Sequence, residues 1–164
     1  MRAFKLTVWI LALYVIQAVF GDCISVFGAS PDFMLAFAIA FSFMEKRVSK
    51  CGYIIVICAV LGGACVGRVF PVVVLLTGLS GVFAHILSGY LRFVPGFVRV
   101  TLLTLAAAIA TGAVECLTAV GYVDFSKVFT AAVYTAVMSV AVYYALKRTL
   151  FKENIKSLII GERN

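Results

Sequence analysis

Residues 71–91 read PVVVLLTGLSGVFAHILSGYL and contain no Asp, Glu, Lys or Arg. Arg68 lies shortly before this stretch, and Arg92 follows it directly. A helix needs about 20 mostly apolar residues to cross the hydrocarbon core of a bilayer. The stretch therefore predicts a membrane-spanning helix bounded by basic residues at both ends.

The rest of the chain repeats this alternation of apolar runs and basic residues. Of its 164 residues, 64% are hydrophobic and 13% are charged, and the mean hydropathy is +1.13. A soluble domain of this size cannot bury so much apolar surface. The runs predict an all-α polytopic membrane protein with six transmembrane helices, at residues 4–20, 31–44, 51–66, 71–91, 97–120 and 126–146.

Two features of the segment pattern leave alternatives open. The second and third runs are short, so they would tilt little or thin the bilayer locally, and five crossings is the nearest alternative to six. Residues 1–146 form a single transmembrane domain in this interpretation. Residues 147–164 instead predict a cytoplasmic basic amphipathic tail, which lies on the inner leaflet or extends the sixth helix into solvent.

The basic residues predict the orientation. With six crossings, one side of the membrane carries 12 of the 14 Lys and Arg residues, and the other side carries Arg68 and Lys127. Loops rich in Lys and Arg stay in the cytoplasm, so both termini are expected there. The net charge of +7 is then explained by the membrane surface, and nucleic acid is not an expected partner.

Two helix starts carry capping residues. Ser30 is expected to cap the second helix, with Pro31 at its first position and Asp32 near the positive end of the helix dipole. Asp124 or Ser126 is expected to cap the sixth helix.

His85 and Glu115 are the ionisable residues that fall clearly inside predicted spans, where a charge costs at least a few kcal/mol. The topology puts His85 nearer the cytoplasmic end and Glu115 nearer the outer end, so they are not expected to be partners. A neutral imidazole hydrogen-bonded between helices is the favoured interpretation of His85. Three interpretations of Glu115 stay open: it is hydrated at the membrane interface, it lines a polar cavity, or it pairs with Arg68 or Lys127.

No pattern of residues predicts catalysis. The chain lacks a paired acid and base or an activated nucleophile, so we expect no enzyme, no catalytic residue and no cofactor. Cys51, Cys58 and Cys65 recur every seven residues over about 21 Å of helix. That separation excludes a shared metal ion or a disulfide among them, and it favours a role in packing.

Residues 27–35, FGASPDFML, place a Pro-Asp pair between the first apolar run and the second, and Lys46, Arg47 and Lys50 follow. With the chain length, the six-helix pattern and the cytoplasmic termini, this arrangement resembles the MreD family of bacterial rod shape-determining membrane proteins. Members of that family typically carry Pro-Asp or Pro-Asn at this place. Many also have an acidic residue late in the third helix, which residues 59–63 lack here.

The resemblance implies a non-enzymatic scaffold of the cell-elongation machinery in the bacterial inner membrane. It implies an MreC-like protein as the docking partner, with MreB filaments, peptidoglycan synthases and membrane lipids as further partners. The residues that we single out for interaction or for structure are Pro31, Asp32, Arg68, His85 and Glu115.

The family fold resembles the S-components of energy-coupling-factor transporters, which supplies an alternative, a vitamin-binding transporter subunit. S-components usually carry an Ala-xxx-Ala pair on the first helix, but Ala12 and Ala18 are six positions apart. The predicted outer loops are also short for ligand binding. Both points favour the scaffold.

Overall fold

Six α-helices follow one another along the residues that the computed structural model describes, which are 2–20, 25, 29–65, 69–91, 93–119 and 121–150. The prediction of an all-α fold is confirmed. The helices are α1 (Arg2–Phe20), α2 (Phe33–Met44), α3 (Val48–Gly63), α4 (Phe70–Tyr90), α5 (Gly96–Ala119) and α6 (Phe125–Thr149).

The start of α2 differs from the prediction. The helix begins at Phe33, and its N-cap is Asp32 rather than Ser30. The Asp32 side chain accepts a hydrogen bond from the backbone N–H of Leu35 at 2.9 Å. A carboxylate at this place also complements the positive end of the helix dipole, which explains why Asp32 takes the cap position. Pro31 therefore precedes the cap instead of opening the helix.

Other helix boundaries differ from the predicted ones by a few residues. The third helix starts at Val48, three residues before the predicted Cys51, and ends at Gly63. The sixth helix starts after Asp124, whose side chain accepts from the backbone N–H of Lys127 at 3.3 Å. It continues to Thr149, so Lys147 and Arg148 lie in its last turn. The rest of the predicted amphipathic tail, from residue 151 on, lies outside the described residues.

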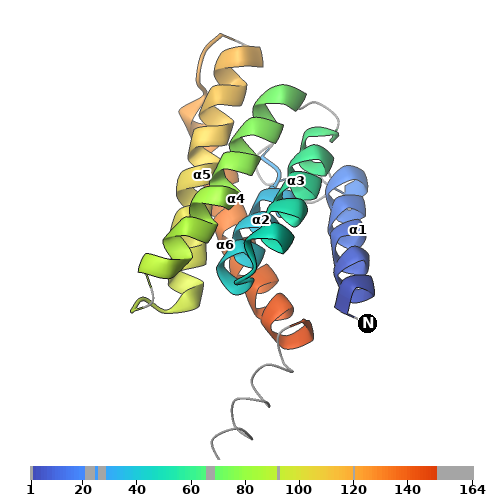
Figure 1. Cartoon of the computed structure of the whole chain (residues 1–164). Helices are drawn as coiled ribbons and strands as arrows, with labels where there is room; N and C mark the ends of the chain where they lie inside the picture. The colour runs from blue at the N-terminus through green and yellow to red at the C-terminus, as the bar shows by residue number, and fades with distance from the viewer. Residues whose placement is uncertain are drawn as a thin grey trace, which may run out of the picture.

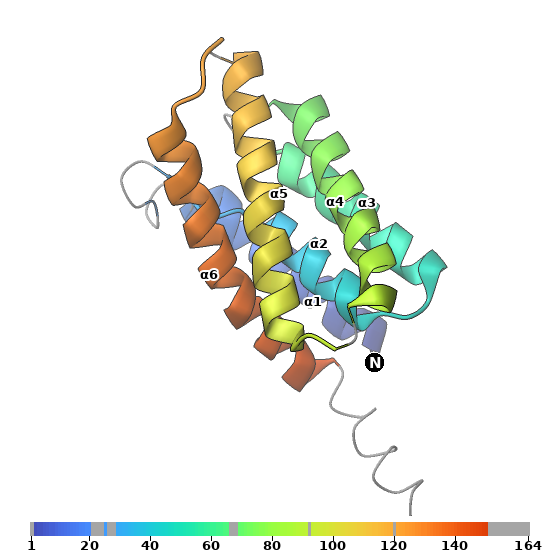
Figure 2. The same ribbon diagram turned by 90° about the vertical axis from the view of Figure 1, so that its left-hand side faces the viewer.

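The shortest helix, α2, lies at the centre of the bundle and contacts each of the other five helices. Figures 1 and 2 show it enclosed by α3, α4, α5 and α6, with α1 at one side. Every residue from Met34 to Ala40 has 0% of its surface exposed. With 12 residues it is about 18 Å long, too short to cross a bilayer alone. Its place inside the bundle lets the protein, and not lipid, surround it.

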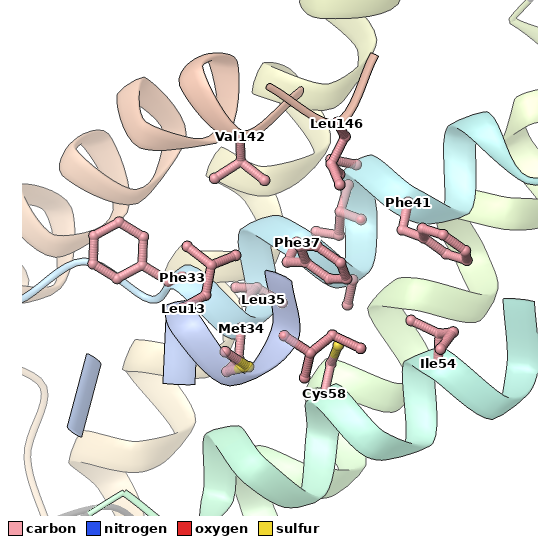
Figure 3. Close-up of a cluster of buried hydrophobic side chains, with 14 of the residues drawn as sticks. Leu13, Phe33, Met34, Leu35, Phe37, Phe41, Ile54, Cys58, Val142 and Leu146 are labelled. Carbon is pink, nitrogen blue, oxygen red and sulfur yellow. The ribbon is translucent and has the colours of Figure 1, made fainter. Parts of the chain in front are cut away.

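The core around α2 is built from side chains of several helices (Figure 3). Phe33 and Phe37 of α2 lie near Leu13 of α1 and near Val142 and Leu146 of α6. The rings of Phe37 and Phe41 stack with their centroids 6.1 Å apart. On the α3 side, Met34 lies close to Cys58 in the same cluster.

Two glycines set the close approach of α3 and α4 to their neighbours. A Cβ added at Gly81 of α4 would lie 2.8 Å from Cγ1 of Ile55 in α3. A Cβ added at Gly62 of α3 would lie 3.1 Å from Cβ of Met34 in α2. Small residues at such contacts let helices pack closely in lipid, where dispersion contacts replace the hydrophobic effect.

The outer surface of the bundle is apolar. Large exposed side chains include Leu11 on α1, Tyr53 on α3, Leu79 on α4, Leu102 on α5 and Val137 on α6. Among the described helices, α4, α5 and α6 are long and apolar enough to cross a membrane, whereas the apolar parts of α1, α2 and α3 are shorter. An outward-facing apolar surface of this extent is typical of a protein embedded in lipid.

Basic side chains gather at one end of the molecule. The N-terminus, the α4–α5 connection and the last turn of α6 all lie at the lower end in Figure 1. The described basic residues of these segments and of the α2–α3 connection are exposed or half-buried: Lys5, Lys46, Arg47, Lys50, Arg99, Lys147 and Arg148. At the opposite end, Lys127 in the first turn of α6 lies 3.8 Å from the carboxylate of Asp124, the N-cap of that helix.

Candidate functional site

A polar cluster of Gln17, Asp32 and Thr135 holds the amino end of α2 inside the bundle; we call it the Asp32 cluster. These residues come from α1, the cap of α2 and α6. Asp32 is 6% exposed, and Pro31 beside it is buried. Pro31 has no backbone N–H, so its burial leaves no unsatisfied donor.

Each member of the Asp32 cluster satisfies a backbone group that the start of a helix leaves without an internal partner. The Gln17 side chain accepts from the N–H of Met34 at 3.0 Å and donates to Oδ1 of Asp32 at 3.5 Å. The Thr135 hydroxyl oxygen accepts from the N–H of Asp32 at 3.0 Å. The same hydroxyl donates to the carbonyl of Ala131 at 2.7 Å. The cluster therefore joins three helices through the first turn of α2.

The carboxyl end of α2 is held by side chains from α3 and α4. The Nδ1 atom of His85 lies 3.3 Å from the carbonyl oxygen of Ser42. A carbonyl oxygen only accepts, so this contact requires the proton on Nδ1. The hydroxyl of Ser42 donates to the carbonyl of Ala38 at 2.6 Å, and the thiol of Cys51 lies 3.5 Å from that hydroxyl oxygen. In that tautomer His85 donates to a carbonyl in the last turn of α2.

The turn after α2 is also ordered by local contacts. The N–H of Glu45 donates to the carbonyl of Phe41 at 2.9 Å, and the Glu45 carboxylate accepts from the N–H of Arg47 at 3.2 Å. The guanidinium of Arg99, at the start of α5, lies 5.7 Å from the ring centre of Phe43. This cation–π contact brings a basic residue of α5 to the carboxyl end of α2.

The remaining predicted site residues are Glu115 and Arg68, and the structure describes Glu115 alone of these two. Glu115 is half-buried near the end of α5, and Thr118 donates to its backbone carbonyl at 3.0 Å. His85 lies near the other end of the bundle, because α4 and α5 run in opposite directions. The structure therefore keeps the two ionisable residues apart. Arg68 lies outside the described residues.

Sequence reasoning missed Gln17, Ser42 and Thr135. Gln17 and Ser42 are polar residues within otherwise apolar runs, and that was the one signal in the sequence that could have pointed to them. Thr135 is one of several Thr residues in α5 and α6, so its type alone did not single it out. Its role depends on the packing of α6 against α2, which spacing along the chain does not encode.

The chemistry of these contacts is that of helix capping. The side chains of the Asp32 cluster accept from backbone N–H groups at the start of α2, and they donate to one another or to the backbone of α6. Within the described part of the chain, no three His, Cys, Asp or Glu residues lie together in an arrangement able to hold a metal ion. The arrangement fixes the position of α2 relative to α1, α4 and α6.

The fold and this site together define an all-α protein with three helices able to cross a membrane, built around a short buried helix. No protein-family model matches the chain, and comparisons with curated proteins and with solved structures give no significant match.

Proposed function

We propose that this protein is an integral membrane scaffold of the bacterial cell-elongation machinery. In this proposal it crosses the inner membrane six times, with both termini in the cytoplasm, and docks the membrane anchor of an MreC-like protein. The observation that carries the proposal is the Asp32 cluster. Asp32 belongs to residues 27–35, the stretch that most resembles MreD proteins, and its contacts join α1, α2 and α6.

The hydrogen bonds of Asp32 support the proposal that the protein is a scaffold. Its hydrogen bonds hold helices in place and give the bundle a fixed outer shape. A fixed shape is what a docking surface for another membrane helix needs, since helix association in lipid depends on close complementary packing. The apolar exposed faces of the outer helices supply the area for such contacts.

The distribution of charge supports the proposed orientation. Exposed Lys5, Lys46, Lys50 and Lys147 lie at one end of the bundle, where anionic lipid headgroups of the cytoplasmic leaflet would attract them. A phosphatase domain fused after Tyr122 should therefore be active outside the membrane, and one fused at the C-terminus should be inactive. The reverse pattern would contradict the orientation.

The function is tested by depleting the protein from rod-shaped cells that encode it. We expect depleted cells to become round, and the wild-type gene to restore rods. Asp32→Asn, which keeps a capping oxygen, should restore rods better than Asp32→Ala does. In mild detergent, an MreC-like protein should co-purify with the wild type. Depleted cells that keep their width and lose uptake of a vitamin would contradict the scaffold and favour a transporter subunit.

A further inference from the structure

On α4, α5 and α6, the apolar outer surface of the bundle extends over most of the length of each helix. On α4, the exposed large apolar side chains run from Phe70 to Tyr90, which is about 30 Å at about 1.5 Å per residue. On α5 they run from Phe97 to Leu117, again about 30 Å, and on α6 they cover about 28 Å. These lengths match the hydrocarbon core of a typical bilayer, which is about 30 Å thick.

The opposite flank, formed by α1 and α3, is short. On α1 the exposed large apolar side chains, among those that the structure describes, run from Phe4 to Val19, about 22 Å. On α3 they run from Val48 to Val60, about 18 Å. The short α2 adds little to either surface, because its residues from Phe33 to Ser42 are buried. The apolar surface is therefore about 6–8 Å shorter on α1, and about 10–12 Å shorter on α3, than on α4, α5 and α6.

The short helices form one continuous surface. Among the described helices, α1 contacts only α2 and α3, so α1 and α3 are neighbours on the outside of the bundle. Figure 1 shows them on the right-hand side, while α4 and α5 on the left reach higher. Because the lower ends of α1, α5 and α6 lie close to one level, most of the difference falls at the end away from the basic residues.

From these lengths we propose that the α1–α3 flank binds lipids that form a thinner hydrocarbon layer, and so thins the bilayer on one side of the protein. An apolar surface shorter than the bilayer is accommodated by thinning the lipid next to it, and lipids with short chains do this at the least cost. The occupant of this flank is therefore short-chain lipid. The inference rests on the membrane location in the proposed function, and it adds a lipid preference confined to one side.

The test uses a tryptophan reporter on each flank. Trp9 is the single Trp of the chain, so Trp9→Phe removes the background signal. Leu11→Trp and Leu79→Trp are then made separately in that background. The two leucines are a matched pair, because Leu11 is 57% exposed near the middle of α1 and Leu79 is 60% exposed near the middle of α4.

Each reporter protein is reconstituted into phosphatidylcholine vesicles that mix short monounsaturated chains (about 14 carbons) with long ones (about 22 carbons). Bromine is placed on the short lipid in one series and on the long lipid in the other, and quenching of Trp fluorescence gives the relative binding of the two lipids. For Leu11→Trp we expect the short lipid to be preferred by about threefold or more. For Leu79→Trp we expect no preference for the short lipid.

The same preference at both reporters would overturn the inference, as would a preference for the long lipid at Leu11→Trp. Quenching of Leu79→Trp with none at Leu11→Trp would also overturn it, because protein and not lipid would then cover α1. The experiment is separate from the test of the scaffold. A loss of rod shape on depletion does not depend on lipid preference, and a lipid preference is measured on purified protein without any partner.

Discussion

The hydroxyl oxygen of Thr135 lies 3.0 Å from the backbone nitrogen of Asp32, although the two residues are 103 positions apart in the chain. Thr135 is 1% exposed and Asp32 is 6% exposed. An amide N–H buried away from water needs a partner, so this bond ties the start of α2 to the middle of α6.

Replacing Thr135 with Val should leave the Asp32 N–H without its acceptor while keeping the shape of the side chain. We expect a loss of about 1–2 kcal/mol in the free energy of unfolding. It would be measured as a lower melting temperature of the purified protein in detergent, by loss of the monodisperse peak after heating. Thr130→Val is the control, since the hydroxyl of Thr130 donates to the carbonyl of Ser126 within its own helix. Equal melting temperatures for the two variants would contradict the role of Thr135.

Two substitutions of Asp32 should show whether α2 requires the capping oxygen or the negative charge of this residue. Asp32→Ala loses the oxygen that accepts from Leu35 and from Gln17, and we expect it to cost about 1–2 kcal/mol. Asp32→Asn keeps an accepting oxygen at the same place, so it should cost clearly less. Thermal unfolding in detergent would measure both. An Asn variant as unstable as the Ala variant would show that the negative charge, and not the cap, is what α2 requires.

Two glycines of α4 should respond to alanine with opposite signs. At Gly81 the new Cβ would meet Ile55 at 2.8 Å, and we expect a loss of about 1–3 kcal/mol from overpacking. At Gly78 nothing lies within 4 Å, so Gly78→Ala should stabilise the helix by about 0.5–1 kcal/mol. The double change Gly81→Ala with Ile55→Ala should recover part of the loss. Thermal shifts in the same direction for both glycines would contradict the packing of α3 on α4.

Truncating the central aromatic side chain should weaken the bundle more than truncating an exposed one. Phe37 is 0% exposed, and Phe37→Ala leaves a cavity at the centre of the core. We expect a loss of about 2–3 kcal/mol, because the cavity and lost dispersion contacts remain costly even where lipid replaces water as the outer medium. Phe83→Ala is the control, since Phe83 is 53% exposed on α4. A similar loss of unfolding free energy for Phe37→Ala and Phe83→Ala would contradict the position of Phe37 at the centre of the core.

The helices themselves were predictable, because long apolar runs between charged residues encode them directly. The order of all six and the ends of α1, α4 and α5 agree with the sequence to within one or two residues. The cap of α2 was predicted wrongly at Ser30, since Ser and Asp are both good caps and the choice between them depends on which residue meets Leu35.

The central position of α2 was not predictable in the same way. Its residues are apolar on every side, so its pattern marks no inner face and does not distinguish a helix enclosed by protein from one surrounded by lipid. The candidate Asp32 was found because it follows Pro31 at the expected start of the second helix, where a carboxylate is favoured by the helix dipole. Its partners Gln17 and Thr135 required the three-dimensional arrangement, since they come from distant helices.

The enclosure of α2 has a consequence for how the protein is made. A helix of 12 residues is a poor substrate for independent insertion, because it cannot cover the width of the bilayer. Thr135 is synthesised 103 residues after Asp32. Gln17 is synthesised before α2, but the bond between Asp32 and Thr135 cannot form until α6 has left the ribosome. The enclosure of α2 is therefore completed late in synthesis, when α6 packs against it.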